Sequence, residues 1–321
     1  MNLRLELYRK KEKLKRYLRR RRDGSCTVLL YHRVADTGYD PQQLCVSPEN
    51  FEKQLKYLKR HYHFINVEEF NHHLNTNKAF PKNALLINFD DGYADNLLNA
   101  LPILEAKNLQ SVFYIATANL NTNHLFWWDE LDEIFRNKEA INNQVLIRLL
   151  KTYGLSNPEQ LYAFLLTALK TAGSLSVRND LLEKIRQLGT INSDLSPYRC
   201  LTYHELKQLA ASRSAVIGGH TVHHLSLGHL SRADQEYEIQ ISLKILEEIL
   251  QKPVKLFSYP YGERQNYNND TMSICRSLGL SHGAANYGGY VSPADDLFSF
   301  TRFVVRNDNP TVLVQKLKAS L

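Results

Sequence analysis

Cysteine is scarce in this chain, and the few cysteines that occur lie far apart. The 321 residues contain four, and no two of them form a C-x-x-C pair; they are Cys26, Cys45, Cys200 and Cys275. This spacing argues against a zinc ribbon and against a disulfide scaffold. We expect reduced thiols, as in a cytoplasmic protein.

Long apolar segments are also missing. No stretch of about 18 uninterrupted apolar residues occurs, so the sequence predicts no membrane-spanning helix. The first residues contain no apolar core of a signal peptide, and we therefore expect a cytoplasmic location. With 43% hydrophobic and 23% charged residues, the composition is that of a globular protein with one large domain, or one domain plus an insertion.

Excess positive charge is confined to the first residues. The chain has a formal net charge of +7, but residues 1–22 alone carry eleven Lys or Arg and two Glu, which leaves a slightly acidic remainder. One side of a helix built from this segment would carry four leucines: Leu3, Leu7, Leu14 and Leu18. Residues 1–24 are therefore predicted to form a basic amphipathic arm that lies on the anionic inner face of a membrane as a peripheral contact. Two alternatives remain: nucleic-acid binding, for which no recognition motif is present, and a solvated tail or a helix docked on its own domain.

Two adjacent carboxylates follow an apolar run. Residues 85–89 read as a buried strand of a parallel sheet, and the run stops on Asp90, Asp91 and Gly92. In α/β folds ligands bind at the ends of such strands. Neighbouring carboxylates repel, so the pair needs a cation or access to water. An Asp-Asp-Gly turn at the surface explains the same residues equally well, and this segment alone does not decide.

A second apolar run, at residues 216–219, ends on histidines. His220 and His224 are four residues apart, which lets two imidazoles converge on one ion in a helix or in a tight loop. With one carboxylate they form a two-histidine, one-carboxylate set that leaves coordination positions open for water and substrate. A histidine pair by itself is more often structural or incidental, and His223 is an alternative partner.

Taken together, three segments resemble a known family, the polysaccharide deacetylases (the NodB-homology domain, or carbohydrate esterase family four). The segments are NFDDG at 88–92, HTVHH at 220–224 and FSYPYG at 257–262. The resemblance runs from about residue 27 to residue 306, with an interruption near 119–200. It implies a distorted (β/α)7 barrel over residues 25–321 with an α-helical insertion at about 119–200.

The pattern outside the interruption supports a barrel independently. Strand-like and helix-like stretches alternate for roughly seven or eight units, which favours a closed parallel barrel over an open sheet. The interruption is helical and opens with Trp127 and Trp128, which can stack on a sugar ring, although core packing explains them better. In a long helix that begins at Ser231, one face is lined by Tyr237, Ile241, Ile245 and Ile249.

A metal held by a carboxylate and two imidazoles makes a bound water acidic, and an adjacent carboxylate can take its proton. The resemblance assigns Asp90 as the general base, and Asp91, His220 and His224 as the metal ligands. Zinc is the expected ion, and Co²⁺, Ni²⁺ or Fe²⁺ also suit such a set. By the same resemblance, the backbone N–H of Tyr261, in the Pro260–Tyr261 step, stabilises the oxyanion.

Two features common in the family are missing here. Ser258 stands where most members have an arginine that orients the base, and Arg302 or Arg306 is a candidate replacement. The usual C-terminal histidine acid is not evident, because His282 looks like a chance match. The Tyr-Pro-Tyr-Gly version of the third segment resembles the branch of poly-N-acetylglucosamine deacetylases, in which an N-terminal histidine is the acid; here that would be His32. A histidine satisfied at a strand end is the alternative.

The sequence thus predicts a metal-dependent hydrolase that removes the N-acetyl group from an amino sugar in a glycan or a lipid-linked saccharide. A deformylase or O-deacetylase acting on a lipid-linked sugar would use the same metal site. A carbohydrate-binding protein with a vestigial site is the alternative from another class, but a decayed site has no reason to retain the base and all three ligands.

Overall fold

A computed structural model of the chain describes residues 24–191, 194 and 196–319. Its centre is a curled eight-stranded sheet in which neighbouring strands run parallel. In order across the sheet, the strands are β10 (Phe303–Val304), β1 (Cys26–Tyr31), β5 (Ala84–Phe89), β6 (Ser111–Ile115), β7 (Ala215–Gly219), β8 (Leu256–Ser258) and β9 (His282–Ala284), with β4 (His63–Phe64) paired to β5. A small second sheet pairs β2 (Arg33–Val34) with β3 (Cys45–Val46).

The two edges of the curled sheet come together. A single parallel bridge joins Ala284 in β9 to Phe300, just before β10, and the N–H of Ala285 donates to the carbonyl oxygen of Phe300 at 2.8 Å. The predicted distorted (β/α)7 barrel is confirmed in this form, a mostly parallel curled sheet surrounded by helices.

The strands are apolar along their whole length because both of their faces are covered. All six residues of β1 and all six of β5 are buried. Leu29 and Ile87 belong to the hydrophobic cluster shared with the surrounding helices, whereas Val28 and Leu86 belong to a second cluster. Such two-sided burial is typical of parallel strands and accounts for the continuous apolar runs in the sequence.

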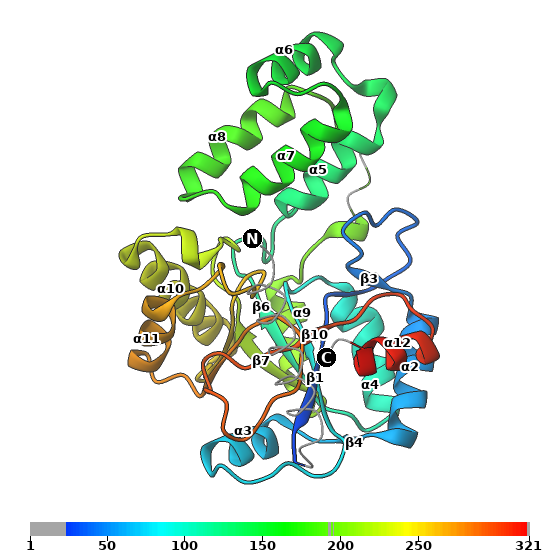
Figure 1. Cartoon of the computed structure of the whole chain (residues 1–321), viewed down its shortest axis with the longest axis vertical. Helices are drawn as coiled ribbons and strands as arrows, with labels where there is room; N and C mark the ends of the chain where they lie inside the picture. The colour runs from blue at the N-terminus through cyan, green and yellow to red at the C-terminus, as the bar shows by residue number, and fades with distance from the viewer. Residues whose placement is uncertain (1–23, 192–193, 195, 320–321) are drawn as a thin grey trace, which may run out of the picture.

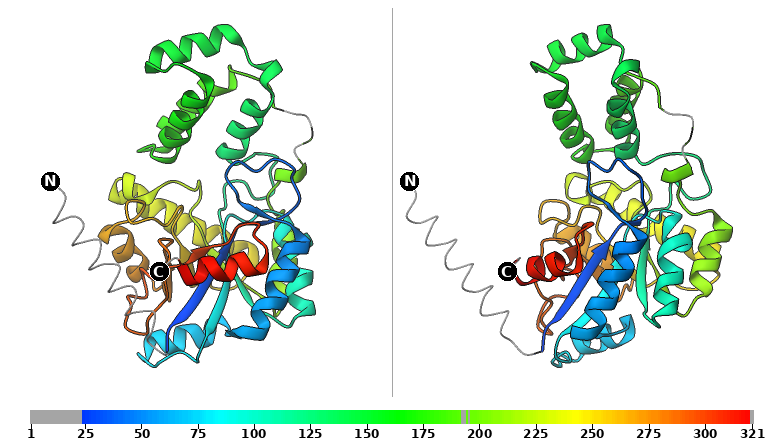
Figure 2. Two further views of the ribbon diagram at one scale, coloured as in Figure 1. Left: turned by 45° about the vertical axis from the view of Figure 1, so that its right-hand side comes forward. Right: turned by 90° about the vertical axis from the view of Figure 1, so that its right-hand side faces the viewer.

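Helices surround the sheet on its outside (Figures 1 and 2). They are α2 (Pro48–His61), α3 (Val67–Asn75), α4 (Leu101–Ala106), α9 (Tyr203–Ala211), α10 (Arg232–Leu250), α11 (Asn269–Ser277) and α12 (Pro310–Ala319). At the start of α2, Ser47 is the cap residue and Pro48 lies in the first turn, a common helix-start pattern. A π-helical turn (Asn96–Ala100) precedes α4, and α4 begins anew with Pro102 in its first turn.

The helical interruption lies between β6 and α9. It contains α5 (Trp127–Arg136), α6 (Asn143–Tyr153), α7 (Pro158–Lys170) and α8 (Leu175–Arg186), all within the range 119–200. Figures 1 and 2 show these green helices standing beyond the carboxyl ends of the strands. They share a hydrophobic cluster that includes Trp128, Leu131, Leu165 and Ile185 and extends to Tyr93 and Ala116 of the barrel. We call α5–α8 the insertion.

The apolar face that the sequence predicted for α10 is not the buried face of the helix. Tyr237 is 55% exposed, and Ile241, Ile245 and Ile249 are only partly buried. The buried face instead carries Ile239, Leu243 and Leu246 together with three polar residues, Gln235, Glu238 and Ser242. Because three polar residues interrupt the buried face, the apolar pattern in the sequence was stronger on the adjacent side of the helix.

In the part of the chain that the structure describes, no helix is long and apolar enough to cross a bilayer. The basic arm predicted for residues 1–24 lies outside the described residues except for Gly24.

Candidate active site

The carboxyl ends of three strands of the curled sheet deliver polar side chains to one cavity. Asp90 and Asp91 follow β5, His220 follows β7, and His32 follows β1. These residues, together with His224 and Tyr261, line a cavity of about 210 Å³. Because the strands are parallel, their carboxyl ends meet at one edge of the sheet, as the sequence predicted.

Asp91, His220 and His224 converge in a way that suits a metal ion. Each offers one ligand atom, and the three atoms lie within 4.8 Å of one another. Asp91 Oδ1 is 3.6 Å from His220 Nε2 and 3.3 Å from His224 Nε2. All three side chains are buried.

Both imidazoles are prepared to act as neutral ligands. Burial lowers the pKa of His220 to about 4 and that of His224 to about 3, so each ring is uncharged at neutral pH. His220 Nδ1 lies 2.8 Å from the carbonyl oxygen of Ser258, which can only accept. The proton is therefore on Nδ1, and Nε2 keeps its lone pair facing Asp91.

The Asp91 carboxylate lacks a compensating protein group. Its Oδ1 atom is buried without a hydrogen-bond partner among the described residues, and burial raises the pKa of the group. Leaving a buried acceptor unpaired is costly, and a divalent cation between Oδ1 and the two Nε2 atoms would remove that cost. The three residues thus fit the divalent metal that the sequence predicted.

Asp90, by contrast, is fully engaged with the protein. Arg302 Nη1 and Nη2 donate to its two oxygens at 2.7 Å each, and the Ser258 hydroxyl donates to Oδ1 at 3.2 Å. Burial by itself would raise the pKa of Asp90, but Arg302 and His220 outweigh burial and lower the pKa to about 2. Of the two arginines that the sequence offered as orienting residues, the structure places Arg302 on Asp90. Arg306 instead donates to the backbone carbonyls of Gln42 and Gln43.

His32 lines the same cavity. Its Nδ1 atom is buried without a hydrogen-bond partner among the described residues. In a histidine with a purely structural role at a strand end, this atom would be hydrogen-bonded to a neighbouring group. Burial lowers its pKa, against the opposing effect of Asp91 and Asp90. By comparison, His282 hydrogen-bonds Tyr114 and Asn71 and does not line this cavity.

Tyr261 lines the cavity, whereas Pro260 does not and holds the turn that presents Tyr261. No hydrogen-bond acceptor for the Tyr261 N–H is found among the described residues. The tight turn requires glycine at the next position: Gly262 has φ +64°, and a Cβ there would lie 2.7 Å from the backbone nitrogen of Asn286.

The backbone at the site is unusual in a way that the sequence does not reveal. Asp91, Thr221, His224 and Tyr261 all adopt positive φ, between 54° and 78°. Residues other than glycine rarely adopt this conformation, and such strain gathers at functional sites. The surrounding structure must therefore hold these four positions.

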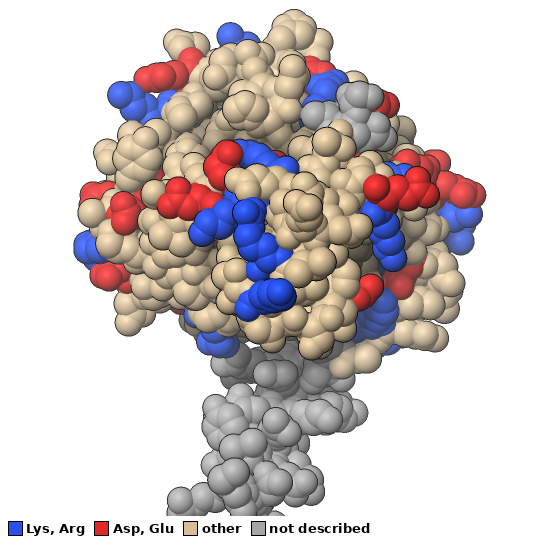
Figure 3. Space-filling model, turned by 90° about the horizontal axis from the view of Figure 1, so that it is seen from above, with Lys and Arg blue, Asp and Glu red and all other residues tan. Residues whose placement is uncertain are grey.

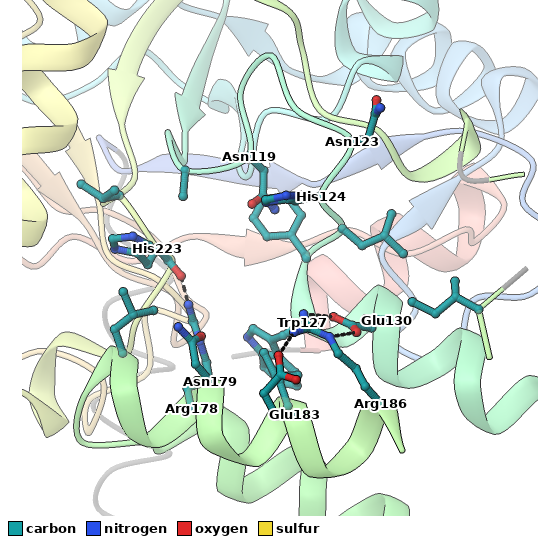
Figure 4. A pocket seen from close by; sticks show the side chains of 17 residues that line it. Asn119, Asn123, His124, Trp127, Glu130, Arg178, Asn179, Glu183, Arg186 and His223 are labelled. Carbon is teal, nitrogen blue, oxygen red and sulfur yellow. Dashed lines mark hydrogen bonds and ion pairs between the residues drawn. The ribbon is translucent and has the colours of Figure 1, made fainter. Parts of the chain in front are cut away.

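Two charged side chains hold the loop that carries His220 and His224. Glu238 of α10 accepts the N–H groups of Val222 and His223 at 3.0 and 2.8 Å. Arg178 of α8 donates to the carbonyl oxygen of His223 at 2.8 Å and to that of His224 at 3.4 Å, and Figure 4 shows the first of these bonds. The barrel thus binds the N–H groups of this loop through Glu238, and the insertion binds its carbonyl groups through Arg178. The His223 ring is itself bound to Glu238 at 2.7 Å and is not part of the metal-binding group.

The insertion also supplies walls to the cavity. Trp127, Trp128, Leu166 and Lys170 line it. Trp128 meets the ring of His224 edge-on, with centroids 4.7 Å apart, and Trp127 Nε1 donates to the Tyr261 hydroxyl at 3.2 Å. The two tryptophans therefore pack in a core and border the cavity at once. For Lys170 and Leu166 no sequence signal exists, because α7 reads as an ordinary amphipathic helix.

A second and larger cavity, of about 680 Å³, shares Trp127 with the first (Figure 4). It lies between α8 and the loops at 118–127 and 222–223. The side chains of Arg178 and Arg186 border it, and Arg186 is paired there with Glu130. It contains none of the residues of the metal-binding group.

Comparison with known proteins agrees with this arrangement. The sequence profile "Polysaccharide deacetylase" matches residues 77–146 and 191–283, just over half of the chain. The chain is similar to the poly-beta-1,6-N-acetyl-D-glucosamine N-deacetylase of Staphylococcus aureus, 23% identical over 300 residues, covering 89% of this chain and 81% of that protein. It is also similar to the putative polysaccharide deacetylase YxkH of Bacillus subtilis, 18% identical over 299 residues, covering 93% of this chain and 77% of that protein.

Solved structures show the same fold. The deacetylase PplD of Streptococcus pyogenes, in complex with acetate, superposes with a TM-score of 0.59 at 20% identity, covering 91% of this chain and 98% of PplD. IcaB from Ammonifex degensii superposes with a TM-score of 0.59 at 17% identity, covering 92% and 97%. With the profile match, these findings show that the chain belongs to the polysaccharide deacetylase family and is a hydrolase of non-peptide carbon–nitrogen bonds.

Proposed function

We propose that this chain is a metal-dependent deacetylase that removes the N-acetyl group from an amino sugar of a glycan or a lipid-linked saccharide. The observation that carries the proposal is the contrast between the two adjacent carboxylates. Asp90 is held by Arg302, while Asp91 is buried with an oxygen that has no hydrogen-bond partner among the described residues and that faces two neutral imidazoles. One carboxylate is arranged as a base and the other as a ligand.

The metal would be held by Asp91, His220 and His224, with zinc as the expected ion. When bound, such an ion makes a coordinated water acidic enough to attack near neutral pH. Asp90, which is ionised because its pKa is about 2, accepts a proton in the attack. Arg302 and Ser258 orient its oxygens.

In this proposal, two further groups serve the rest of the amide cleavage. The N–H of Tyr261, which lines the cavity, would donate to the developing oxyanion. His32, also lining the cavity, would protonate the departing amine. The S. aureus relative acts, by its name, on poly-beta-1,6-N-acetyl-D-glucosamine, and we propose an N-acetylglucosamine-like sugar as the substrate here.

Acetate release from β-1,6-linked N-acetylglucosamine oligomers by the purified, zinc-loaded chain tests the proposal. Asp90→Asn is the matched variant, because it keeps the shape and removes the proton acceptor. We expect acetate from the wild type, and a rate lower by roughly two to four orders of magnitude in the variant with its metal content unchanged. Release of formate from formamido sugars without acetate from acetamido sugars would favour the deformylase instead. No hydrolysis by a metal-loaded protein that still binds sugar would favour the vestigial binding protein.

We further propose that the enzyme works in the cytoplasm, at the inner membrane surface, with residues 1–22 as the contact. Support comes from the concentration of basic residues in that segment alone.

A further inference from the structure

The catalytic cavity is built from two parts of the chain. The barrel supplies the metal-binding group, Asp90 and His32, and the insertion supplies Trp127, Trp128, Leu166 and Lys170. An open groove across the carboxyl end of the barrel would have walls from barrel loops alone. Here α5 and α7 form part of the wall.

Hydrogen bonds tie the insertion to the barrel at the cavity itself. Gln42, a cavity residue from the loop before β3, donates through Nε2 to the Tyr162 hydroxyl at 2.6 Å and to Asp132 Oδ1 at 3.2 Å. Tyr162 in turn donates to Asp132 at 2.6 Å. A barrel loop and two insertion helices are therefore joined by one small network.

A second tie involves Lys170. Its ammonium group lies 2.9 Å from Glu263 Oε2 and 4.9 Å from the centre of the Tyr261 ring. Both partners belong to the turn that follows β8, and Tyr261 lines the cavity. The ion pair is partly exposed and contributes little stability by itself. It nevertheless holds the Lys170 side chain in its position in the cavity wall.

The size of the cavity limits what it can enclose. Its volume of about 210 Å³ is below the range of roughly 300–1,000 Å³ found for pockets that enclose drug-sized ligands. This is room for one sugar ring with its acetamido group and not for several linked rings. On the insertion side, Lys170 and the Gln42–Tyr162 network form the wall that a sugar chain continuing past the reacting residue would meet.

We propose that the enzyme deacetylates a terminal sugar, the last residue of a glycan or the sugar of a glycolipid, and not an interior residue of a polysaccharide. This inference rests on the proposed function and narrows its substrate class. In it, Lys170 and Gln42 determine specificity by blocking continuation of the sugar chain beyond the reacting residue.

Mapping the deacetylated positions in a defined oligomer tests the inference. A fully acetylated β-1,6-linked N-acetylglucosamine pentamer is treated with the zinc-loaded enzyme, and the positions of free amines are assigned by tandem mass spectrometry. We expect one free amine per molecule, at one end. Free amines appearing at interior positions as fast as at the ends would overturn the inference while leaving the proposed function intact. Absence of acetate from both the pentamer and N-acetylglucosamine would overturn the proposed function, and this inference with it.

Shortening the wall tests the assigned residues. Lys170→Ala and Gln42→Ala are expected to raise the ratio of interior to terminal deacetylation by roughly tenfold each. Tyr153→Phe is the matched control, because Tyr153 belongs to α6 of the same insertion and lines neither cavity. The control should keep the wild-type ratio, and wild-type ratios in both wall variants would show that these residues do not set the specificity.

Discussion

The residues of the active site divide by what holds them. Asp90 is paired with a buried arginine from the far end of the chain, and His220 is oriented by a carbonyl oxygen, whereas Asp91 and His32 each have a buried atom without a partner among the described residues. Groups that must keep one orientation are held by the protein, and the groups with unpaired atoms face the cavity, where metal and substrate would bind.

Arg302 should act as a positioning residue for Asp90. It is 0% exposed and donates to both carboxylate oxygens. Arg302→Lys keeps the positive charge but loses the two-pronged geometry, so we expect kcat to fall about 10- to 100-fold with metal content and KM little changed. Arg306→Lys is the control, since the Arg306 guanidinium donates to backbone carbonyls near the cavity. An equal loss of kcat in the two variants would show that Arg302 does not position Asp90 specifically.

His32 is expected to protonate the leaving amine. His32→Ala should keep its metal and lower kcat on acetamido sugars by roughly two to four orders of magnitude. The loss should be much smaller on an activated aryl acetate, whose leaving group needs no proton. If both substrates lose activity equally, the histidine has a structural role and the acid must be sought elsewhere.

At the scale of elements, the insertion takes part in the catalytic site. Its helix α8 carries Arg178, 6% exposed, whose guanidinium donates to backbone carbonyls of the loop that carries His220 and His224. Its helix α5 places Trp128 against His224. The left-handed conformation of His224 is therefore stabilised from a segment that lies outside the α/β pattern.

Loss of Arg178 should weaken metal binding. Arg178→Gln removes the charge-assisted bonds to the carbonyls of His223 and His224, and we expect zinc affinity to fall by about 10- to 100-fold. Titration calorimetry with zinc on metal-free protein measures this without any assay of activity. Arg186→Gln is matched to it, because Arg186 borders the same cavity from the same helix but pairs with Glu130 and Glu183. Unchanged affinity in the Arg178 variant would show that the loop holds its shape without the insertion.

Asp129, at the start of α5, should make stability depend on pH. Burial raises its pKa to about 7, and it accepts a hydrogen bond from Tyr93 at 2.6 Å. Between about pH 4 and pH 7 the unfolded chain gives up this proton while the folded chain retains it, so stability falls as the pH rises through that range. Asp129→Asn resembles the protonated side chain. The melting temperature of the variant minus that of the wild type should therefore increase by a few degrees from pH 4.5 to pH 8. The exposed Asp180, changed to Asn, should show no such gain.

Local sequence patterns predict some features of these elements and miss others. The cap of α2 was readable because Ser47 and Pro48 act within one turn. The buried face of α10 was not, because Glu238 is buried where it holds the loop that carries His220 and His224, and it interrupts the apolar stripe. A residue used for a distant loop cannot be recognised from its own helix.

For the whole molecule, the membrane contact remains a prediction that rests on residues 1–22. Figure 3, which looks onto the insertion, shows acidic and basic side chains interspersed on that face, without a large area of one sign. Deleting residues 1–22 should abolish binding to vesicles rich in phosphatidylserine and leave turnover of a soluble acetamido sugar unchanged. Cosedimentation with vesicles measures the first, and acetate release the second. Equal vesicle binding by the shortened protein would eliminate the arm as the contact.

The sequence alone determined the fold class and the candidates for the reacting groups. Each chemical motif follows directly on an apolar run, so the position of Asp90, Asp91 and His220 at the carboxyl ends of parallel strands could be deduced from local pattern. The order of the three motifs then identified the family.

Only the tertiary structure decided which residues support those groups. Arg302 reaches Asp90, Arg178 reaches the His224 loop, and Lys170 reaches the cavity across long stretches of chain. Such contacts depend on how helices and loops pack in three dimensions, and no spacing or periodicity records them. The left-handed backbone at Asp91 and His224 likewise depends on the structure around it, since neither residue type favours that conformation enough to predict it.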